Sequence, residues 1–174
     1  MSSRPPVFTI GHSTRSVEEF IALLLAHHIE LVVDVRTVPR SRRNPQFNRE
    51  TLPHSLQAVG VAYEHAGALG GFRRPDRESA NAGWRNASFR GYADYMQTAG
   101  FATAIETLME RAEHRRLVVM CAEAVPWRCH RSLIADALVA RGISVEEIIS
   151  TNRTQPHAMT SFAHVEGTAV TYPA

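Results

Sequence analysis

Short apolar runs alternate with amphipathic helical patterns along most of this chain, and that alternation restricts the fold. The clearest runs, at 31–35 and 117–120, are almost continuously apolar, which is typical of strands buried on both faces of a parallel sheet. Each is followed by a polar segment and then by residues with helical spacing. We therefore expect a single three-layer α/β domain over residues 1–174, with about five mostly parallel strands and helices on both faces.

Local signals place the individual elements. Ser16 and Glu19 have the spacing of a capping box, which predicts a helix start, and a glycine turn at Glu166 and Gly167 predicts a hairpin in the tail. Strands are predicted at 7–10, 31–35, 61–64, 117–121 and 143–149, and further helices at 49–59, 89–98, 101–114 and 129–141. Residues 67–88 are rich in glycine, arginine and asparagine and are predicted to form a long loop.

The basic residues favour an anionic partner. Residues 36–90 hold ten arginines and four acids, a net charge of +6, whereas the rest of the chain sums to −4. Such an asymmetry is typical of proteins that bind an anionic small molecule or nucleic acid. The chain has no lysine, which excludes Schiff-base chemistry through a lysine amine and a Walker-type phosphate loop.

The apolar runs are too short to suggest a membrane protein. None approaches the roughly 18 residues of a membrane span, and residues 1–6 lack the apolar stretch of a secretory signal. We expect a cytoplasmic protein without a membrane partner, in which the two cysteines are thiols.

Three polar clusters each follow a predicted strand. They are 11–13 after the first strand, 34–41 at the end of the second, and 121–131 after the fourth. In a doubly wound sheet the carboxyl ends of these strands meet where the strand order reverses, and ligands bind in that crevice. We therefore expect the three clusters to form one pocket.

Cys121 and Cys129 bracket the third cluster. Cys129 lies where a helix is predicted to begin, and a helix N-terminus favours the thiolate. The spacing differs from the Cys-x-x-Cys of zinc and redox sites and from the Cys-x5-Arg of phosphatase and rhodanese loops. The sequence therefore allows three roles for the thiols: nucleophiles, metal ligands together with His130, or core residues.

The three clusters supply residues for catalysis and for binding. We expect His12 or His130 to move protons with help from Glu123 or Asp34, and Cys121 or Cys129 to act as nucleophile or metal ligand. Arginine forks suit phosphate and carboxylate groups. The predicted substrate-binding residues are Ser13, Arg36, Arg40, Ser41, Phe47 and Arg131.

The same residues carry a family resemblance. The motifs are 9–13, 34–41, 44–47, 69–71, 89–94, 121–123 and 129–131, and the similarity extends to the tail at Tyr172 and Pro173. Together they resemble the domain of unknown function 488 family of bacteria and archaea. The resemblance implies that the clusters belong to one site, and it implies no reaction, because the family has no established activity.

The leading hypothesis is an enzyme that acts on a phosphate-bearing or nucleic-acid-derived substrate in an arginine-lined pocket with cysteine and histidine. One alternative is a nucleic-acid-binding module without catalysis, which uses the arginine-rich loops. Another is a protein that senses a metal or the redox state. Catalysis, a bound metal ion and the oligomeric state are left open by the sequence.

Overall fold

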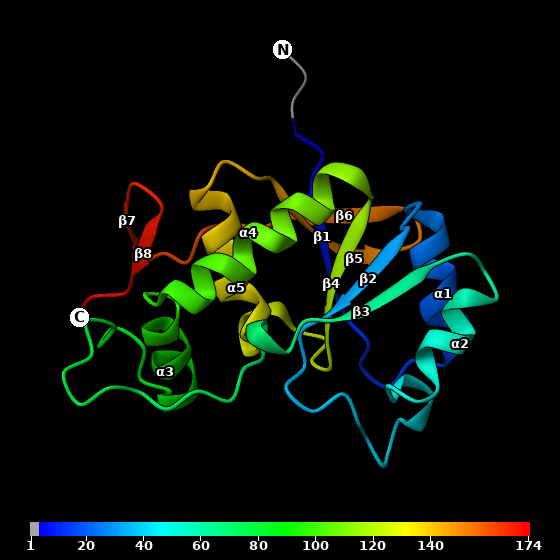
Figure 1. The fold of residues 1–174 in the computed structure, drawn as a ribbon, viewed down its shortest axis with the longest axis horizontal. Helices are drawn as coiled ribbons and strands as arrows, with labels where there is room; N and C mark the ends of the chain where they lie inside the picture. Colours follow the sequence, from blue (N-terminus) through cyan, green and yellow to red (C-terminus); the bar gives the residue numbers. More distant parts are fainter. Residues whose placement is uncertain (1–3) are drawn as a thin grey trace.

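A six-stranded sheet forms the centre of the protein, in the order β3-β2-β4-β1-β5-β6 (Figure 1). The computed structural model describes residues 4–174. The first five strands in that order are parallel, and β6 adds an antiparallel edge. The strands are β1 (Val7–Gly11), β2 (Leu31–Asp34), β3 (Ala62–His65), β4 (Leu117–Cys121), β5 (Val145–Ser150) and β6 (Arg153–Pro156).

Helices cover both faces of the sheet because successive strand residues point to opposite sides. On β4, Leu117, Val119 and Cys121 join one buried cluster, whereas Val118 and Met120 join the other. The first cluster packs under α3 (Ala87–Tyr95), α4 (Ala99–His114) and α5 (Arg131–Ala140), and the second under α1 (Val17–Ala26) and α2 (Leu52–Gln57). The predicted three-layer α/β architecture is confirmed.

The strand order creates a crevice at the carboxyl edge of the sheet. The chain leaves β1 through α1 on one face and leaves the neighbouring β4 through α5 on the other. Two adjacent parallel strands whose connections go to opposite faces leave their carboxyl ends uncovered. The loops after β1, β2 and β4 meet at this point.

Helix starts follow local chemistry. The Ser16 side chain accepts from the Glu19 N–H while Glu19 reaches back, so the predicted capping box is present. In α2 the proline lies in the first turn, where its missing N–H has no cost, and the helix is shorter than predicted. α5 begins at Arg131 rather than at 129, because Pro126–Arg128 forms a separate 3-10 helix that ends in an extended Cys129.

The C-terminal segment folds against the face of the sheet that α3, α4 and α5 cover. β7 (His164–Glu166) and β8 (Ala169–Thr171) form the predicted hairpin, and Gly167 takes the positive φ of 65° that its turn requires. The edge strand β6 was not predicted, because Arg153–Pro156 is polar and mostly exposed and carries no apolar alternation. Within residues 4–174, no helix is both long and apolar enough to span a membrane.

Candidate functional site

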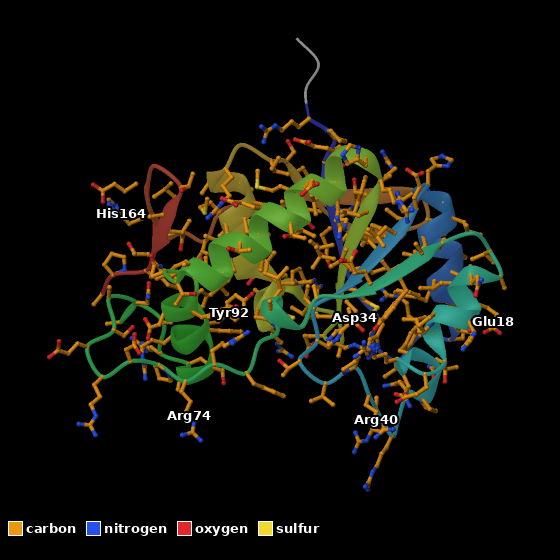
Figure 2. The ribbon with its side chains drawn as sticks, in the orientation of Figure 1. Glu18, Asp34, Arg40, Arg74, Tyr92 and His164 are labelled. Atoms are coloured by element: carbon orange, nitrogen blue, oxygen red, sulfur yellow. The ribbon has the colours of Figure 1, made fainter. Side chains whose placement is uncertain are left out.

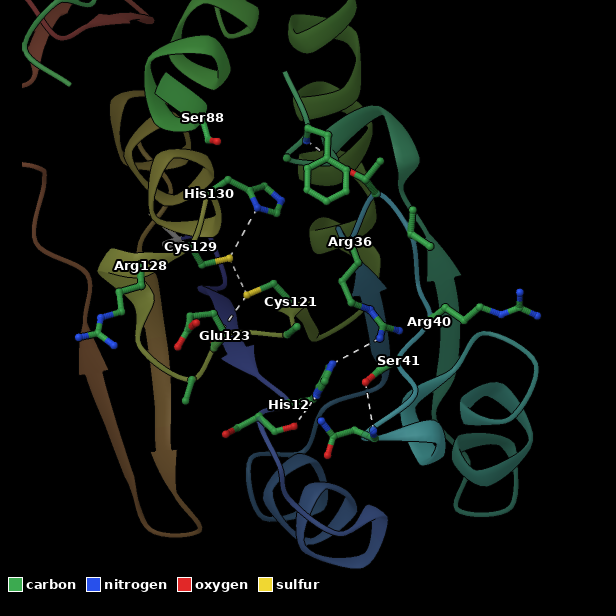
Figure 3. A pocket seen from close by; sticks show the side chains of 18 of the residues that line it. His12, Arg36, Arg40, Ser41, Ser88, Cys121, Glu123, Arg128, Cys129 and His130 are labelled. Atoms are coloured by element: carbon green, nitrogen blue, oxygen red, sulfur yellow. Dashed lines mark hydrogen bonds between the residues drawn. The ribbon is translucent and has the colours of Figure 1, made fainter. Parts of the chain in front are cut away.

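A cavity of about 720 Å³ opens at the carboxyl edge of the sheet and is shown in Figure 3. Volumes of this size are typical of sites for small ligands. Its wall combines the loop after β1, the loop after β2, the segment from β4 to α5, and residues of the long loop before α3. The three clusters that follow the strands are therefore side by side, and they are joined by direct hydrogen bonds.

An ion pair fixes the loop after β2. The Arg36 guanidinium donates to both Asp34 carboxylate oxygens at 2.9 and 2.7 Å, and to the Phe47 carbonyl at 2.7 Å. The Asp34 side chain is fully buried and also accepts from the Tyr63 hydroxyl, so its charge is compensated by two donors. Most of the donor capacity of Arg36 is thus committed to the protein rather than to a ligand.

His12 links the β1 loop to this ion pair. Its Nδ1 lies 2.8 Å from the Ser13 carbonyl, which can only accept, so Nδ1 carries the proton and Nε2 accepts from Arg36 at 3.3 Å. The ring stacks on Phe47, with centroids 4.3 Å apart. Burial lowers the pKa of His12 to about 4, and the Arg36 charge acts in the same direction. His12 is therefore neutral at physiological pH.

The two thiols lie against each other in the wall that the segment from β4 to α5 forms. Cys121 Sγ, at the end of β4, and Cys129 Sγ, two residues before α5, are 2.6 Å apart, and both are free cysteines. Burial raises the pKa of Cys121 well above its ordinary value. The hydrogen bond with Cys121 lowers the pKa of Cys129 to about 4, and His130 adds to this effect. The two opposite shifts favour a pair that shares one proton, with the negative charge on Cys129.

His130 is oriented toward the thiolate. Its Nε2 donates to the Val35 carbonyl at 2.9 Å, so Nδ1 is the nitrogen that faces Cys129 Sγ, at 3.6 Å. Figure 3 shows this chain of contacts from His130 through Cys129 to Cys121. The bond to Val35 also ties α5 to the end of β2.

Arg131 holds the loop after β4 in shape. Its side chain is fully buried, and it donates to Glu147 at 2.6 Å, to Cys121 Sγ at 2.7 Å, and to the carbonyls of Glu123 and Ala124. Burial disfavours the guanidinium charge, but the sulfur and carboxylate neighbours raise the pKa of Arg131 above its ordinary value. It does not line the cavity of the thiols; it borders a second one of about 400 Å³.

The basic groups that remain available lie at the rim. Arg40 and Arg128 line the mouth of the cavity, and the Arg40 side chain is 69% exposed with only an exposed Glu50 as its ion-pair partner. Figure 2 shows Arg40 and Arg74 extending outward from loops at this edge, whereas Asp34 lies inside. Phe72 adds an aromatic ring that is 80% exposed.

Nine of the twelve residues predicted for the site line this cavity. Asp34, Phe47 and Arg131 lie behind its wall, where they support Arg36, His12 and the loop after β4. The nine residues are His12, Ser13, Arg36, Arg40, Ser41, Cys121, Glu123, Cys129 and His130.

Sequence reasoning did not identify Arg128 and Phe72 at the rim or Glu147 behind Arg131. Arg128 lies within the predicted cluster 121–131, so its position in the sequence could have identified it as a site residue. Phe72 lies in a loop without periodicity, and Glu147 lies on β5, sixteen residues after its partner, so no local pattern marks either.

The donors for a metal ion are sparse. Within the described part of the chain, no group of three or more histidine, cysteine, aspartate or glutamate side chains is arranged to hold a metal. Cys121, Cys129 and His130 are neighbours, but the thiols contact each other and the His130 Nε2 is bound to a carbonyl.

Comparisons with known proteins place the chain in a family without indicating its activity. Neither the search of curated proteins nor that of solved structures found a match. A sequence model described as "Domain of unknown function DUF488" matches residues 16–138, which include the loop after β2, both thiols and His130. The chain therefore belongs to the DUF488 family.

Proposed function

We propose that the protein is a thiol-dependent enzyme that acts on a phosphate-bearing or nucleic-acid-derived substrate, with Cys129 as its nucleophile. One observation carries the proposal: Cys129 Sγ lies between Cys121 Sγ at 2.6 Å and His130 Nδ1 at 3.6 Å, in the wall of the cavity of about 720 Å³. Activated thiols next to an imidazole are the usual arrangement for nucleophilic catalysis by cysteine.

His130 is suited to move the proton. The Val35 carbonyl accepts from Nε2, so Nδ1 is the nitrogen that faces Cys129. Ionisation of the Cys129 thiol passes its proton to Nδ1, and the thiolate that attacks is then paired with an imidazolium. As the thiolate attacks an electrophilic centre, the imidazolium can return that proton to the leaving group.

The rim and the loop after β4 suit an anionic substrate. Arg40 and Arg128 are the guanidinium groups nearest the opening whose charge is not buried in an ion pair. The carbonyls of Glu123 and Ala124 point to Arg131, so the N–H groups that follow them in the chain point away from it. Peptide N–H groups in such a turn favour negative charge.

The test is turnover of a panel of phosphate monoesters, nucleotides and short oligonucleotides. Wild-type protein should turn over at least one class. Cys129→Ser should lose about a thousandfold or more, and His130→Ala roughly 100-fold or more. Leu25→Ala, an exposed change on α1 away from the cavity, serves as the control. No turnover by the wild type, or full turnover by Cys129→Ser, contradicts the proposal.

A second candidate is binding of single-stranded nucleic acid without catalysis. The specific observation is the exposed Phe72 ring beside the cavity, next to Arg73 and Arg74 in the basic part of the chain. Exposed aromatic rings among arginines stack on bases. This function predicts affinity that falls steeply with salt and is lost in Phe72→Ala but kept in Cys129→Ser.

A further inference from the structure

We propose that Cys121 and Cys129 are a redox-active pair, which a small hydroperoxide converts into an intramolecular disulfide. This modification needs no substrate of the proposed reaction, so it stands or falls separately from the proposed function. The chain has no other cysteine, and the two thiols come from different elements, the end of β4 and the segment before α5.

The sulfur atoms are already placed for bond formation. Their separation is 2.6 Å, and a disulfide requires about 2.05 Å. A displacement of about half an ångström closes this gap, which is within reach of a side-chain rotation. Cys129 has extended backbone at the junction between a 3-10 helix and α5, so the adjustment does not have to break a regular helix.

The charges around the pair favour one thiolate and one thiol. His130 lies beside Cys129 at 3.6 Å, and the Arg131 guanidinium donates to Cys121 Sγ at 2.7 Å. The thiolate is the form that attacks an oxidant, and a neighbouring thiol completes the disulfide. Each sulfur thus has a neighbour that stabilises its thiolate, and the two lie close enough for one to attack the oxidant and the other to complete the disulfide.

The chemistry balances with a hydroperoxide as the oxidant. The Cys129 thiolate attacks the terminal peroxide oxygen, the O–O bond breaks, and the departing alkoxide takes a proton from water. Cys129 is then a sulfenic acid. The Cys121 sulfur attacks that sulfur, the S–S bond forms, and hydroxide leaves with the Cys121 proton as water. Two thiols lose two electrons, and the peroxide is reduced to an alcohol and water.

The cavity limits which oxidants reach the pair. Cys121 and Cys129 are only 1% and 7% exposed, yet both line the cavity of about 720 Å³. A small peroxide can enter this space, whereas the thiols of a second chain cannot approach closely. The disulfide should therefore form within one chain, and it should remove the nucleophile until a thiol reductant restores it.

The experiment uses the full reduced chain, treated with hydrogen peroxide at one equivalent and analysed by mass spectrometry after denaturation. We expect the loss of two hydrogen atoms, one peptide pair joined through Cys121 and Cys129, no free thiol, and full recovery with dithiothreitol. Two remaining thiols, or disulfides only between chains, would overturn the proposal. The measurement is made on the wild type and does not depend on a variant that folds.

Two serine variants separate the roles of the sulfurs. In Cys121→Ser, Cys129 should gain oxygen atoms instead of forming a disulfide, because the second thiol is missing. In Cys129→Ser, the remaining Cys121 thiol should be oxidised at least about tenfold more slowly, because its burial disfavours the thiolate. Equal oxidation rates in the two variants would contradict the assigned roles, whatever the turnover measurements give.

Discussion

Two histidines that line the cavity show how hydrogen bonds set the chemistry of a residue. His12 is stacked on Phe47, and both of its ring nitrogens are engaged, one by a carbonyl and one by Arg36. His130 uses only Nε2 for a carbonyl and turns Nδ1 to a sulfur. The same side chain is therefore a fixed, neutral support in one place and a candidate proton carrier in the other.

The neutral state of His12 predicts a pH dependence of stability. In the unfolded chain it takes a proton near 6.5, but in the folded chain only near 4. Between these values the unfolded state binds more protons, so the free energy of unfolding falls as the pH drops from about 6.5 to about 4. Urea unfolding measures the free energy of unfolding of wild type and His12→Asn across this range. This free energy should fall less in the variant, and the difference should reach roughly 3 kcal/mol at the acid end. Parallel curves would contradict this account.

At the scale of elements, the site depends on how closely the loops after β1 and β4 approach. The N–H groups of His12 and Ser13 donate to the carbonyls of Cys121 and Ala122 at 2.9 and 3.0 Å, and Gly11 lies against Glu123. A Cβ atom at Gly11 would lie 1.7 Å from the Glu123 carbonyl oxygen. Only glycine allows this contact, which brings the imidazole loop to the thiol loop.

Gly11→Ala should therefore separate the two loops and destabilise the fold by about 1–3 kcal/mol. Gly100→Ala is the matched control, because its Cβ meets nothing closer than 3.8 Å and alanine suits its position in α4. Thermal unfolding of both variants measures the difference. A Gly11→Ala protein as stable as the wild type would show that the loops are not in close contact.

The sequence predicts elements well where burial leaves a local pattern. The parallel strands were predicted because two buried faces produce continuous apolar runs, as at β2 and β4, and Ser16 marks its helix through its own cap. The polar edge strand β6 has no such pattern. In the site, the ends of the predicted strands indicated which loops would form the pocket. The ion pairs of Arg36 and Arg131 could not be predicted in this way, because they depend on tertiary contacts that only the fold defines.

For the whole molecule, the C-terminal tail connects segments that lie far apart in the sequence. Tyr172 is fully buried, its hydroxyl donates to the buried Asp136 on α5 at 2.7 Å, and its N–H donates to Asn81 in the long loop. Asp136 also accepts from His157 and Thr160. The tail therefore joins α5, the long loop and the segment after β6 around one carboxylate.

Tyr172→Phe should lower the free energy of unfolding by about 1–3 kcal/mol, because it removes one donor from a buried carboxylate. Tyr95→Phe is the control, since that hydroxyl donates to the Ala68 carbonyl at the surface and should matter less. Urea unfolding compares the two. An equal effect at both tyrosines would mean that Asp136 does not depend on the tail.

We expect the converging loops of the whole molecule to make Cys129 an activated thiolate, and the pH profile of its alkylation by iodoacetamide measures this property. Peptide mapping assigns the label, and Cys121→Ser keeps a hydroxyl donor while leaving Cys129 as the sole thiol. We expect a constant rate from neutral pH down to about 5, a fall near 4, and a higher apparent pKa in His130→Ala. A wild-type rate that climbs steadily up to about pH 9, as for an ordinary thiol, would contradict it.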